Sequence, residues 1–143
     1  MSIFVDGRKT ALRPLGTRES VRIAFTYAAL NKVDVWAADI MNAYLQAPTS
    51  ESHYIICDLE FGLTNVGKKA KIVRALYGGK ASGQDFRNNL RSCMQHLNFE
   101  SCLANPDVLM RPASKADGTA YYEYVLLYTD DCLVVSENAE RIL

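Results

Sequence analysis

The sequence has no long hydrophobic run, and no stretch approaches the roughly 20 apolar residues that a membrane-spanning helix needs. No hydrophobic signal-peptide segment follows the N-terminus. There is no Asn-x-Ser/Thr acceptor, and no Cys-x-x-Cys spacing among Cys57, Cys93, Cys102 and Cys132. These absences argue against a membrane protein, a zinc site and a secreted disulfide framework. We therefore expect a soluble intracellular protein with free thiols.

Size and composition indicate one globular domain. The chain has 143 residues, of which 49% are hydrophobic and 22% are charged. This is enough for one sizeable core, and the composition is not that of a disordered chain. No internal repeat or low-complexity segment is visible.

The net charge is zero, but the charges are segregated along the chain. From Lys68 to Arg91, seven basic residues stand against Asp85 alone, and from Asp117 to Leu143 six acidic residues stand against Arg141 alone. A basic segment beside an acidic centre is what a metal-dependent enzyme acting on a polyanion needs. The alternative is two solvated faces of opposite sign.

Periodicity and turn residues predict alternating helices and strands. Residues 1–16 show no sustained period and read as an irregular lead-in. Val21, Ala24, Phe25 and Ala28 mark the buried stripe of a helix over 17–32, and Ile23, Tyr27 and Leu30 widen its apolar face, which predicts a well buried helix. The further expected elements are a strand at 33–40, a short helical stretch ending at Pro48, strands at 53–57 and 71–76, a helix opening at Ser82, a strand at 108–111, a hairpin over 121–135 and a helix opening at 137.

Within the expected elements, a few side chains have predicted roles. Ser82 with Asp85 approximates a capping box for the second long helix. Its buried stripe is expected to comprise Phe86, Leu90, Cys93, Met94 and Leu97. His53 and His96 have no partner at ligand spacing and read as structural or surface residues.

The hairpin over 121–135 carries an acidic pair at its turn, Asp130 and Asp131. Two adjacent carboxylates repel each other, and a bound cation relieves that repulsion. A solvated turn is the alternative, because Asp favours turns. A third carboxylate, Asp39, falls at the end of the strand expected at 33–40, and side chains at strand ends can converge on one metal site.

Three motifs in this order resemble the reverse transcriptase of copia-type retrotransposons. They are D-x-x-x-A-Y at 39–44, RALYGGKASGQDF at 74–86 and Y-x-D-D at 128–131. The resemblance covers most of residues 11–143. It implies an α+β fold, an antiparallel sheet with helices packed on one face, like an incomplete right-hand polymerase palm with part of the fingers.

The resemblance also implies roles for individual residues. Asp39 and Asp130 would bridge two Mg²⁺ (or Mn²⁺) ions with support from Asp131, and the carbonyl of Ile40 would be a further metal ligand. The ring of Tyr44 would block a ribose 2′-hydroxyl, although an aromatic residue here also fits an ordinary core pattern. The template and incoming nucleotide would lie against Tyr77, Gly78, Gly79 and Lys80, although Gly-Gly-Lys is also a common turn sequence.

The implied function is RNA-directed DNA polymerisation, with an RNA template, a DNA primer and deoxynucleoside triphosphates as partners. By the resemblance, the fingers segment would precede residue 11, and the thumb and ribonuclease H regions would follow Leu143. We therefore expect residues 17–143 to be an incomplete palm and fingers domain from a larger polyprotein, inactive alone, and located in cytoplasmic virus-like particles or the nucleus. The sequence departs from the family at Thr129, Gly83, Gln84 and Phe86.

Two other functions stay open at this stage. One is a decayed, non-catalytic retroelement remnant with residual nucleic-acid binding. The other is a two-metal phosphohydrolase or nuclease, which uses similar carboxylates. Tyr44 and the glycines at 78–79 separate the nuclease from the polymerase, because a nuclease needs no sugar-selective ring.

Overall fold

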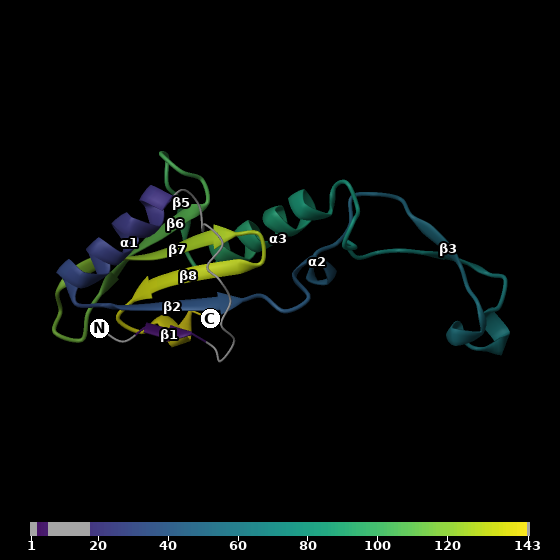
Figure 1. Cartoon of the computed structure of the whole chain (residues 1–143), viewed down its shortest axis with the longest axis horizontal. Coiled ribbons are helices and arrows are strands. Elements are labelled where there is room, and N and C mark those ends of the chain that lie inside the picture. The colour runs from purple at the N-terminus through teal and green to yellow at the C-terminus, as the bar shows by residue number, and fades with distance from the viewer. Residues whose placement is uncertain (1–2, 6–17, 143) are drawn as a thin grey trace. The chain divides into compact units, whose positions relative to one another are not determined.

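The computed structural model describes residues 3–5 and 18–142 of the chain (Figure 1). The chain divides into two compact units. The first is formed by residues 1–41 and 94–143, and the second by residues 42–93. Each unit is described by itself. No helix in the described part of the chain is both long enough and apolar enough to cross a membrane.

The first unit is built on a six-stranded sheet with the order β1-β2-β8-β7-β6-β5. Strand β1 pairs parallel with β2, and the other five strands form an antiparallel sheet. The strands are β1 Ile3–Val5, β2 Asp34–Asp39, β5 Glu100–Ser101, β6 Val108–Ser114, β7 Ala120–Tyr128 and β8 Asp131–Ser136. The predicted α+β class is confirmed. The irregular reading of 1–16 is wrong at residues 3–5, which form a strand, and its remainder lies outside the described residues.

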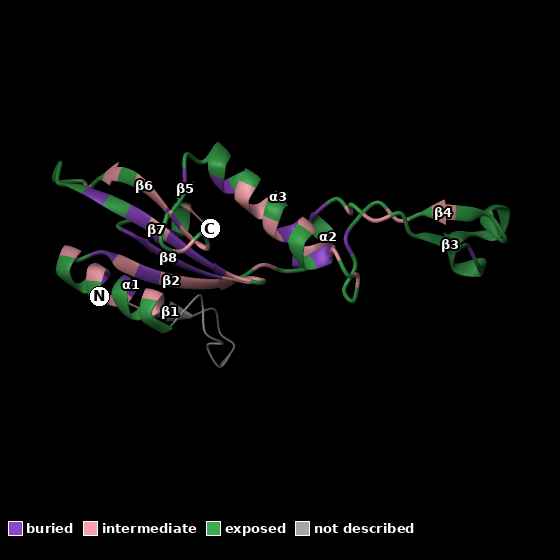
Figure 2. Cartoon of the chain, turned by 90° about the horizontal axis from the view of Figure 1, so that it is seen from above, coloured by how far each residue is buried: buried purple, intermediate pink, exposed green. Residues whose placement is uncertain are grey.

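Helix α1, Arg18–Asn31, packs on the sheet against β2, β7 and β8. Its buried positions Ala24 and Ala28 meet Val35, Leu133 and Val135, which lie on one face because side chains alternate along a strand. Figure 2 shows this buried layer in the first unit. The predicted stripe of the helix is confirmed, and residue 17, its expected first residue, lies outside the described residues.

The expectation that this helix is buried widely around its circumference is wrong. Ile23 and Leu30 are 68% and 78% exposed. The small Ala24 and Ala28 bring the helix close to the sheet along one narrow stripe, so positions off that stripe stay in solvent. Tyr27 is half-buried, and its hydroxyl donates to the carbonyl of Tyr122 and accepts from the Tyr122 amide.

A buried polar network joins β6, β7 and β8 at the Ser136 end of β8. The Glu123 carboxylate accepts hydrogen bonds from Arg111 Nε at 2.6 Å and Ser136 Oγ at 2.6 Å. The Tyr121 hydroxyl donates to the same carboxylate over 3.2 Å. Both oxygens of the buried Glu123 carboxylate therefore accept hydrogen bonds, as a buried charge requires.

After β8 the chain enters a short 3₁₀ turn, η3, Ala139–Arg141, where the opening of a helix was expected.

The second unit consists of short elements. In chain order they are α2 Ala43–Gln46, β3 Tyr54–Ile56, the 3₁₀ turns η1 Leu59–Phe61 and η2 Leu63–Asn65, β4 Lys69–Lys71 and most of α3 Ser82–His96. Strands β3 and β4 form a two-stranded antiparallel ribbon. The strand expected at 71–76 is wrong in position, because the pairing ends at Lys71 and only a single bridge, between Pro48 and Arg74, follows.

Helix α3 begins at Ser82 as predicted, but Asp85 does not close a capping box with it. The Asp85 carboxylate instead accepts hydrogen bonds from the Ser50 amide and hydroxyl at 2.8 and 3.1 Å. The amide of Ala81, just before the helix, donates to Glu51 Oε2 at 3.2 Å. An acid remote in sequence therefore satisfies this helix terminus. Of the predicted stripe, Phe86 and Met94 are buried, Leu90 is half-buried, and Cys93 and Leu97 are exposed.

Candidate active site

Asp39 and Asp131 lie directly opposite each other on neighbouring strands. Asp39 is the last residue of β2, Asp131 is the first of β8, and the two are antiparallel partners. Side chains of such partners leave the same face with Cβ atoms about 4.5–5.5 Å apart. Two like charges in this arrangement destabilise a sheet. The register alone therefore places the carboxylates of Asp39 and Asp131 side by side at this end of the sheet.

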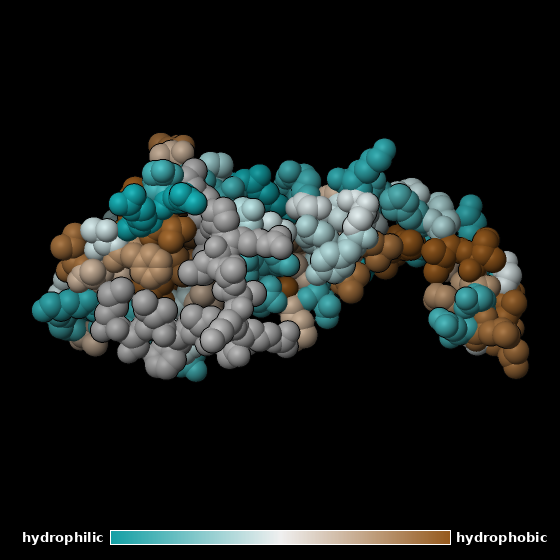
Figure 3. Space-filling view, in the orientation of Figure 1, coloured by the Kyte–Doolittle hydropathy of each residue, from teal (hydrophilic) through white to brown (hydrophobic). Residues whose placement is uncertain are grey.

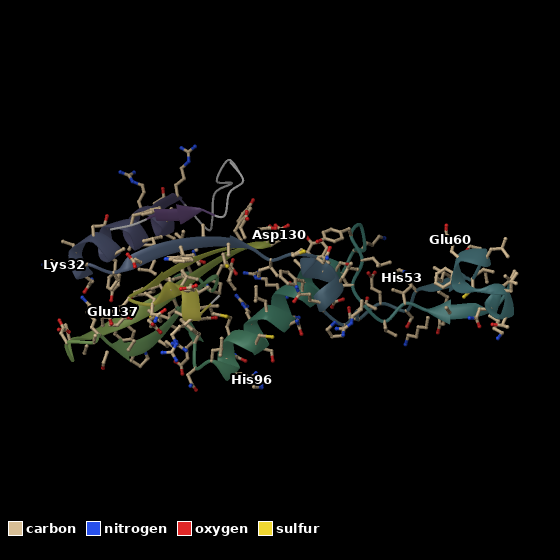
Figure 4. The ribbon with its side chains drawn as sticks, turned by 90° about the horizontal axis from the view of Figure 1, so that it is seen from below. Lys32, His53, Glu60, His96, Asp130 and Glu137 are labelled. Carbon is tan, nitrogen blue, oxygen red and sulfur yellow. The ribbon has the colours of Figure 1, made fainter. Side chains whose placement is uncertain are left out.

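Asp130 lies in the two-residue loop between β7 and β8, at the end of the sheet where β2 also ends (Figure 4). Its carbonyl oxygen accepts a hydrogen bond from the Ile40 amide over 2.7 Å. This bond continues the β2–β8 ladder by one step into the loop. The sequence expectation named Asp130 as the second metal-bridging carboxylate, whereas the cross-strand partner of Asp39 is Asp131.

The other loop residue, Thr129, has a positive φ of 52°. A β-branched residue rarely adopts this region, because its side chain clashes with the backbone there. Backbone strain of this kind persists only where the surrounding structure imposes it, and it is concentrated at functional loops. The strain thus falls on the residue immediately before the two acids.

Cys132 follows the acids and points to the other face of the sheet, as alternation requires. Its side chain is buried, and its Sγ lies 3.5 Å from the carbonyl of Ala38. Burial raises the pKa of this thiol to about 11, and the charges of Asp131 and Asp39 add to the effect. The thiol therefore stays protonated at neutral pH in the metal-free protein.

The acids are accessible, since Asp39 is exposed and Asp130 and Asp131 are half-buried. No ion pair of Asp39 or Asp130 with a basic side chain occurs within residues 3–5 and 18–142. In the same residues, no three Asp, Glu, His or Cys side chains gather closely enough to hold a metal ion. The backbone thus brings together a pair of carboxylates with a third one residue away, rather than a closed three-ligand cage.

In the second unit, Tyr44 and Tyr77 stack on each other. Their ring centroids are 4.6 Å apart with an interplanar angle of 32°, and the ring of Phe86 lies 5.9 Å from Tyr44. Phe86 is buried, Tyr44 is half-buried and Tyr77 is exposed. The structure therefore brings together two residues that the sequence assigned to nucleotide and template binding. Tyr44 is anchored on a core ring and covered on one side by an exposed one.

Local backbone conformation and packing explain why glycine occupies positions 78 and 79 of the predicted template-binding segment. Gly78 has a φ of +91°, which favours glycine. A Cβ on Gly79 would lie 2.3 Å from Ser82 Oγ and 3.2 Å from Glu51 Oε2, so that position has no room for a side chain. Gly79 is therefore packed closely against other residues of the same chain. Lys80, the next residue, is exposed.

Glu51 is a residue of this region that sequence reasoning missed. Besides accepting from the Ala81 amide, its carboxylate lies 3.3 Å from His53 Nε2. No motif marks Glu51, because it acts through a contact 30 residues along the chain. Through this contact Glu51 holds the loop of Gly79 and Lys80 in place.

His53 and His96 are both exposed, which agrees with the prediction that they are structural or surface residues.

The comparisons with known proteins add no relative. Neither a family model, nor a curated protein, nor a solved structure matches this chain.

Proposed function

We propose that this chain carries the palm-type carboxylates of an RNA-directed DNA polymerase of the copia retrotransposon kind. The observation that supports this best is the placement of Asp39 opposite Asp131, with Asp130 in the adjoining loop. Two motifs that are far apart in the sequence thus reach the same end of the sheet, where one acid of each is paired across the strands. A solvated turn would explain Asp130 and Asp131, but it would leave the third acid, Asp39, unexplained.

The donor set fits magnesium. Mg²⁺ takes oxygen ligands, is bound through one or two carboxylates, and completes its coordination with water and substrate phosphate oxygens. Asp39, Asp130 and Asp131 would hold the ions, with the carbonyl of Ile40 as a further oxygen donor. When bound, the two ions would activate the primer 3′-hydroxyl and stabilise the leaving pyrophosphate.

The aromatic pair Tyr44 and Tyr77 supplies the nucleotide-facing part of the proposal. A ring at Tyr44 that is packed on Phe86 cannot easily turn aside, so a ribose 2′-hydroxyl directed at it meets a fixed obstacle. Lys80 is exposed and offers a charge to phosphate. RNA template, DNA primer and deoxynucleoside triphosphates are the partners in this proposal.

Metal binding by NMR with Mn²⁺ tests the proposal. We expect paramagnetic broadening confined to the amides of residues 39–41 and 129–132, and tighter Mn²⁺ binding when dTTP is added, because its phosphates complete the coordination. Asp39→Asn and Asp131→Asn should both abolish the dTTP effect. Glu140→Gln, at an exposed acid in η3 of the same unit, is the matched control.

Broadening spread evenly over acidic residues would mean that no specific site exists, which favours the non-catalytic remnant. Metal-dependent cleavage of single-stranded DNA that Asp39→Asn abolishes would instead assign the acids to a nuclease. In either case the polymerase assignment would be withdrawn.

A further inference from the structure

The two-stranded ribbon of the second unit carries a face of mixed aromatic and basic character. Strands β3 and β4 pair Tyr54 with Lys71 and Ile56 with Lys69. Because side chains alternate along a strand, these four residues share one face and Ile55 and Ala70 lie on the other. We call the first set the ribbon face. It is unlike the acidic end of the sheet in the first unit in both composition and charge.

Tyr54 and Lys69 contact each other across this face. The Lys69 Nζ lies 4.2 Å from the centroid of the Tyr54 ring, within the range of a cation–π interaction. Tyr54 nonetheless remains 52% exposed and Ile56 67% exposed. The contact orders the ring and the ammonium group beside each other while leaving both accessible to a ligand.

The ribbon face has two positive charges and no acid. Lys69 and Lys71 are exposed, and neither is ion-paired with a carboxylate in the part of the chain that the structure describes. The nearby acids Asp58 and Glu60 lie beyond the end of β3, in and just before η1. Figure 4 labels Glu60, in η1, and His53, the residue just before β3.

Neighbouring basic residues do not share this availability. Arg74 donates from Nη1 to the Gln46 carbonyl over 2.8 Å, and Lys68 Nζ lies 3.3 Å from Asn65 Oδ1. The free cations of the ribbon are therefore Lys69 and Lys71, the two that stand beside the exposed aromatic ring. Apolar side chains also lie over the ribbon and its loop in Figure 3, and the exposed Ile56 adds apolar surface to the ribbon face itself.

An exposed ring next to cations matches the chemistry of single-stranded nucleic acid. Unpaired bases stack on aromatic side chains, and their phosphates are held by Lys and Arg. In a duplex the bases are stacked on each other, so none of them is available to stack on the Tyr54 ring. A free phosphate would contact the lysines but gain nothing from Tyr54 or Ile56, whereas an oligonucleotide can contact both the charges and the apolar side chains.

We propose that the ribbon face is a binding site for single-stranded nucleic acid, with a base stacked on Tyr54 and phosphates on Lys69 and Lys71. The proposal rests on the proposed function only for the choice of polymer. Its residues are separate from the carboxylates, and it operates without metal. The ribbon face would thus bind an unpaired strand, in addition to the contacts that the proposed function assigns to the acids and to residues 77–80.

Fluorescence anisotropy with labelled oligothymidylate and oligouridylate, on the whole chain in EDTA, tests the site. Tyr54→Ala should weaken binding about 5- to 150-fold, and Tyr54→Phe should keep most of the affinity, because the ring provides the stacking. Lys69→Gln and Lys71→Gln should each reduce the slope of log affinity against log salt by about 0.7. Lys32→Gln, at an exposed lysine of the first unit, is the matched control and should change neither quantity.

Several results would overturn the proposal. Equal affinity for a duplex together with no effect of Tyr54→Ala would mean that charge alone acts. Binding to phosphatidylserine vesicles but not to oligonucleotides would assign the face to an anionic membrane. Asp39→Asn should leave oligonucleotide binding in EDTA unchanged, so loss of the metal site and loss of the ribbon site are measured separately. Circular dichroism of each variant establishes that it is folded.

Discussion

The backbone amide of Ile40 donates a hydrogen bond to the carbonyl oxygen of Asp130 across 2.7 Å. The bond ties the residue after Asp39 to the loop that precedes Asp131. Because it lies beyond the last cross-strand pair, it fixes the hairpin loop to the end of β2 and limits how far the acids can separate. The carbonyl of the same residue, Ile40, lies just past the last pair of the β2–β8 ladder.

The cross-strand pair of acids predicts a trade between stability and metal binding. Asp39→Asn removes one of two opposed like charges, so without metal the free energy of unfolding should rise by about 0.2–1 kcal/mol. The same change removes a metal-binding carboxylate, so the stabilisation by Mn²⁺ seen in the unchanged protein should be lost. Urea denaturation at pH 7, in EDTA and then in excess Mn²⁺, measures both effects.

Glu140→Gln removes an exposed acid of the same unit that has no cross-strand acidic partner, and it serves as the control. It should shift neither quantity appreciably. If Asp39→Asn lowered the stability in EDTA, the acids would not be repelling each other and the cation-site argument would lose its physical basis.

The sequence predicted most elements of the first unit because their signals are local. The hairpin of β7 and β8 is two β-branched and aromatic runs around an acidic turn, and α1 shows a clear helical stripe. Strand β1 was missed because three residues in an irregular segment carry no period, and only pairing with β2 makes them a strand. Ile23 and Leu30 are apolar but exposed, which composition alone cannot reveal.

In the second unit the sequence was less informative. Residues 71–76 read as a strand because they are apolar, yet the pairing falls at Lys69–Lys71, since the ribbon register is set by the turn region before β4. For the site, motif spacing placed Asp39 at the end of a strand and Asp130 and Asp131 at a turn. That Asp131 is the residue opposite Asp39 depends on the register, which no motif encodes.

The network around Glu123 predicts a stability that depends on pH. Burial by itself would raise the pKa of Glu123, but the hydrogen bonds from Ser136 and Arg111 outweigh it, and the pKa lies below its ordinary value of 4.5. Because the folded protein binds this proton less readily than the unfolded chain, the contribution is complete above pH 4.5 and is lost as the pH falls through the lower folded value. Glu123→Gln should therefore cost about 1.5–3 kcal/mol at pH 7.

Urea unfolding of Glu123→Gln and of the unchanged protein, repeated from neutral to acid pH, measures this difference. The two stabilities should converge below pH 4.5, where the carboxylate of the unchanged protein becomes protonated. Arg111→Lys keeps the charge but loses the second hydrogen bond, from Arg111 Nη1 to the Leu97 carbonyl, and should be intermediate. A stability difference independent of pH would show that the carboxylate charge contributes nothing.

The hydroxyl of Tyr27 is expected to hold α1 onto β7. It donates to the Tyr122 carbonyl at 3.0 Å and accepts from the Tyr122 amide at 2.8 Å, where the β7–β8 pairing has already ended at Tyr124. Tyr27→Phe removes both bonds and should lower the free energy of unfolding by about 1–3 kcal/mol. Tyr54→Phe, at an exposed tyrosine of the ribbon, is the control, and an equal effect of the two changes in urea denaturation would contradict the assignment.

The ring of Tyr44 is expected to discriminate between sugars. It is packed on Phe86 and stacked by Tyr77, so it cannot yield to a ribose 2′-hydroxyl without disturbing both neighbours. If dTTP binds next to this ring in the presence of Mn²⁺, Tyr44→Val should reduce the preference for dTTP over UTP by about 10-fold, the scale of a steric contact of this size. Titration calorimetry with each nucleotide measures the ratio. Tyr44→Phe keeps the ring and should keep the preference. An unchanged ratio for Tyr44→Val, together with a loss of stability, would make Tyr44 a packing residue and would remove sugar selection from the proposed function.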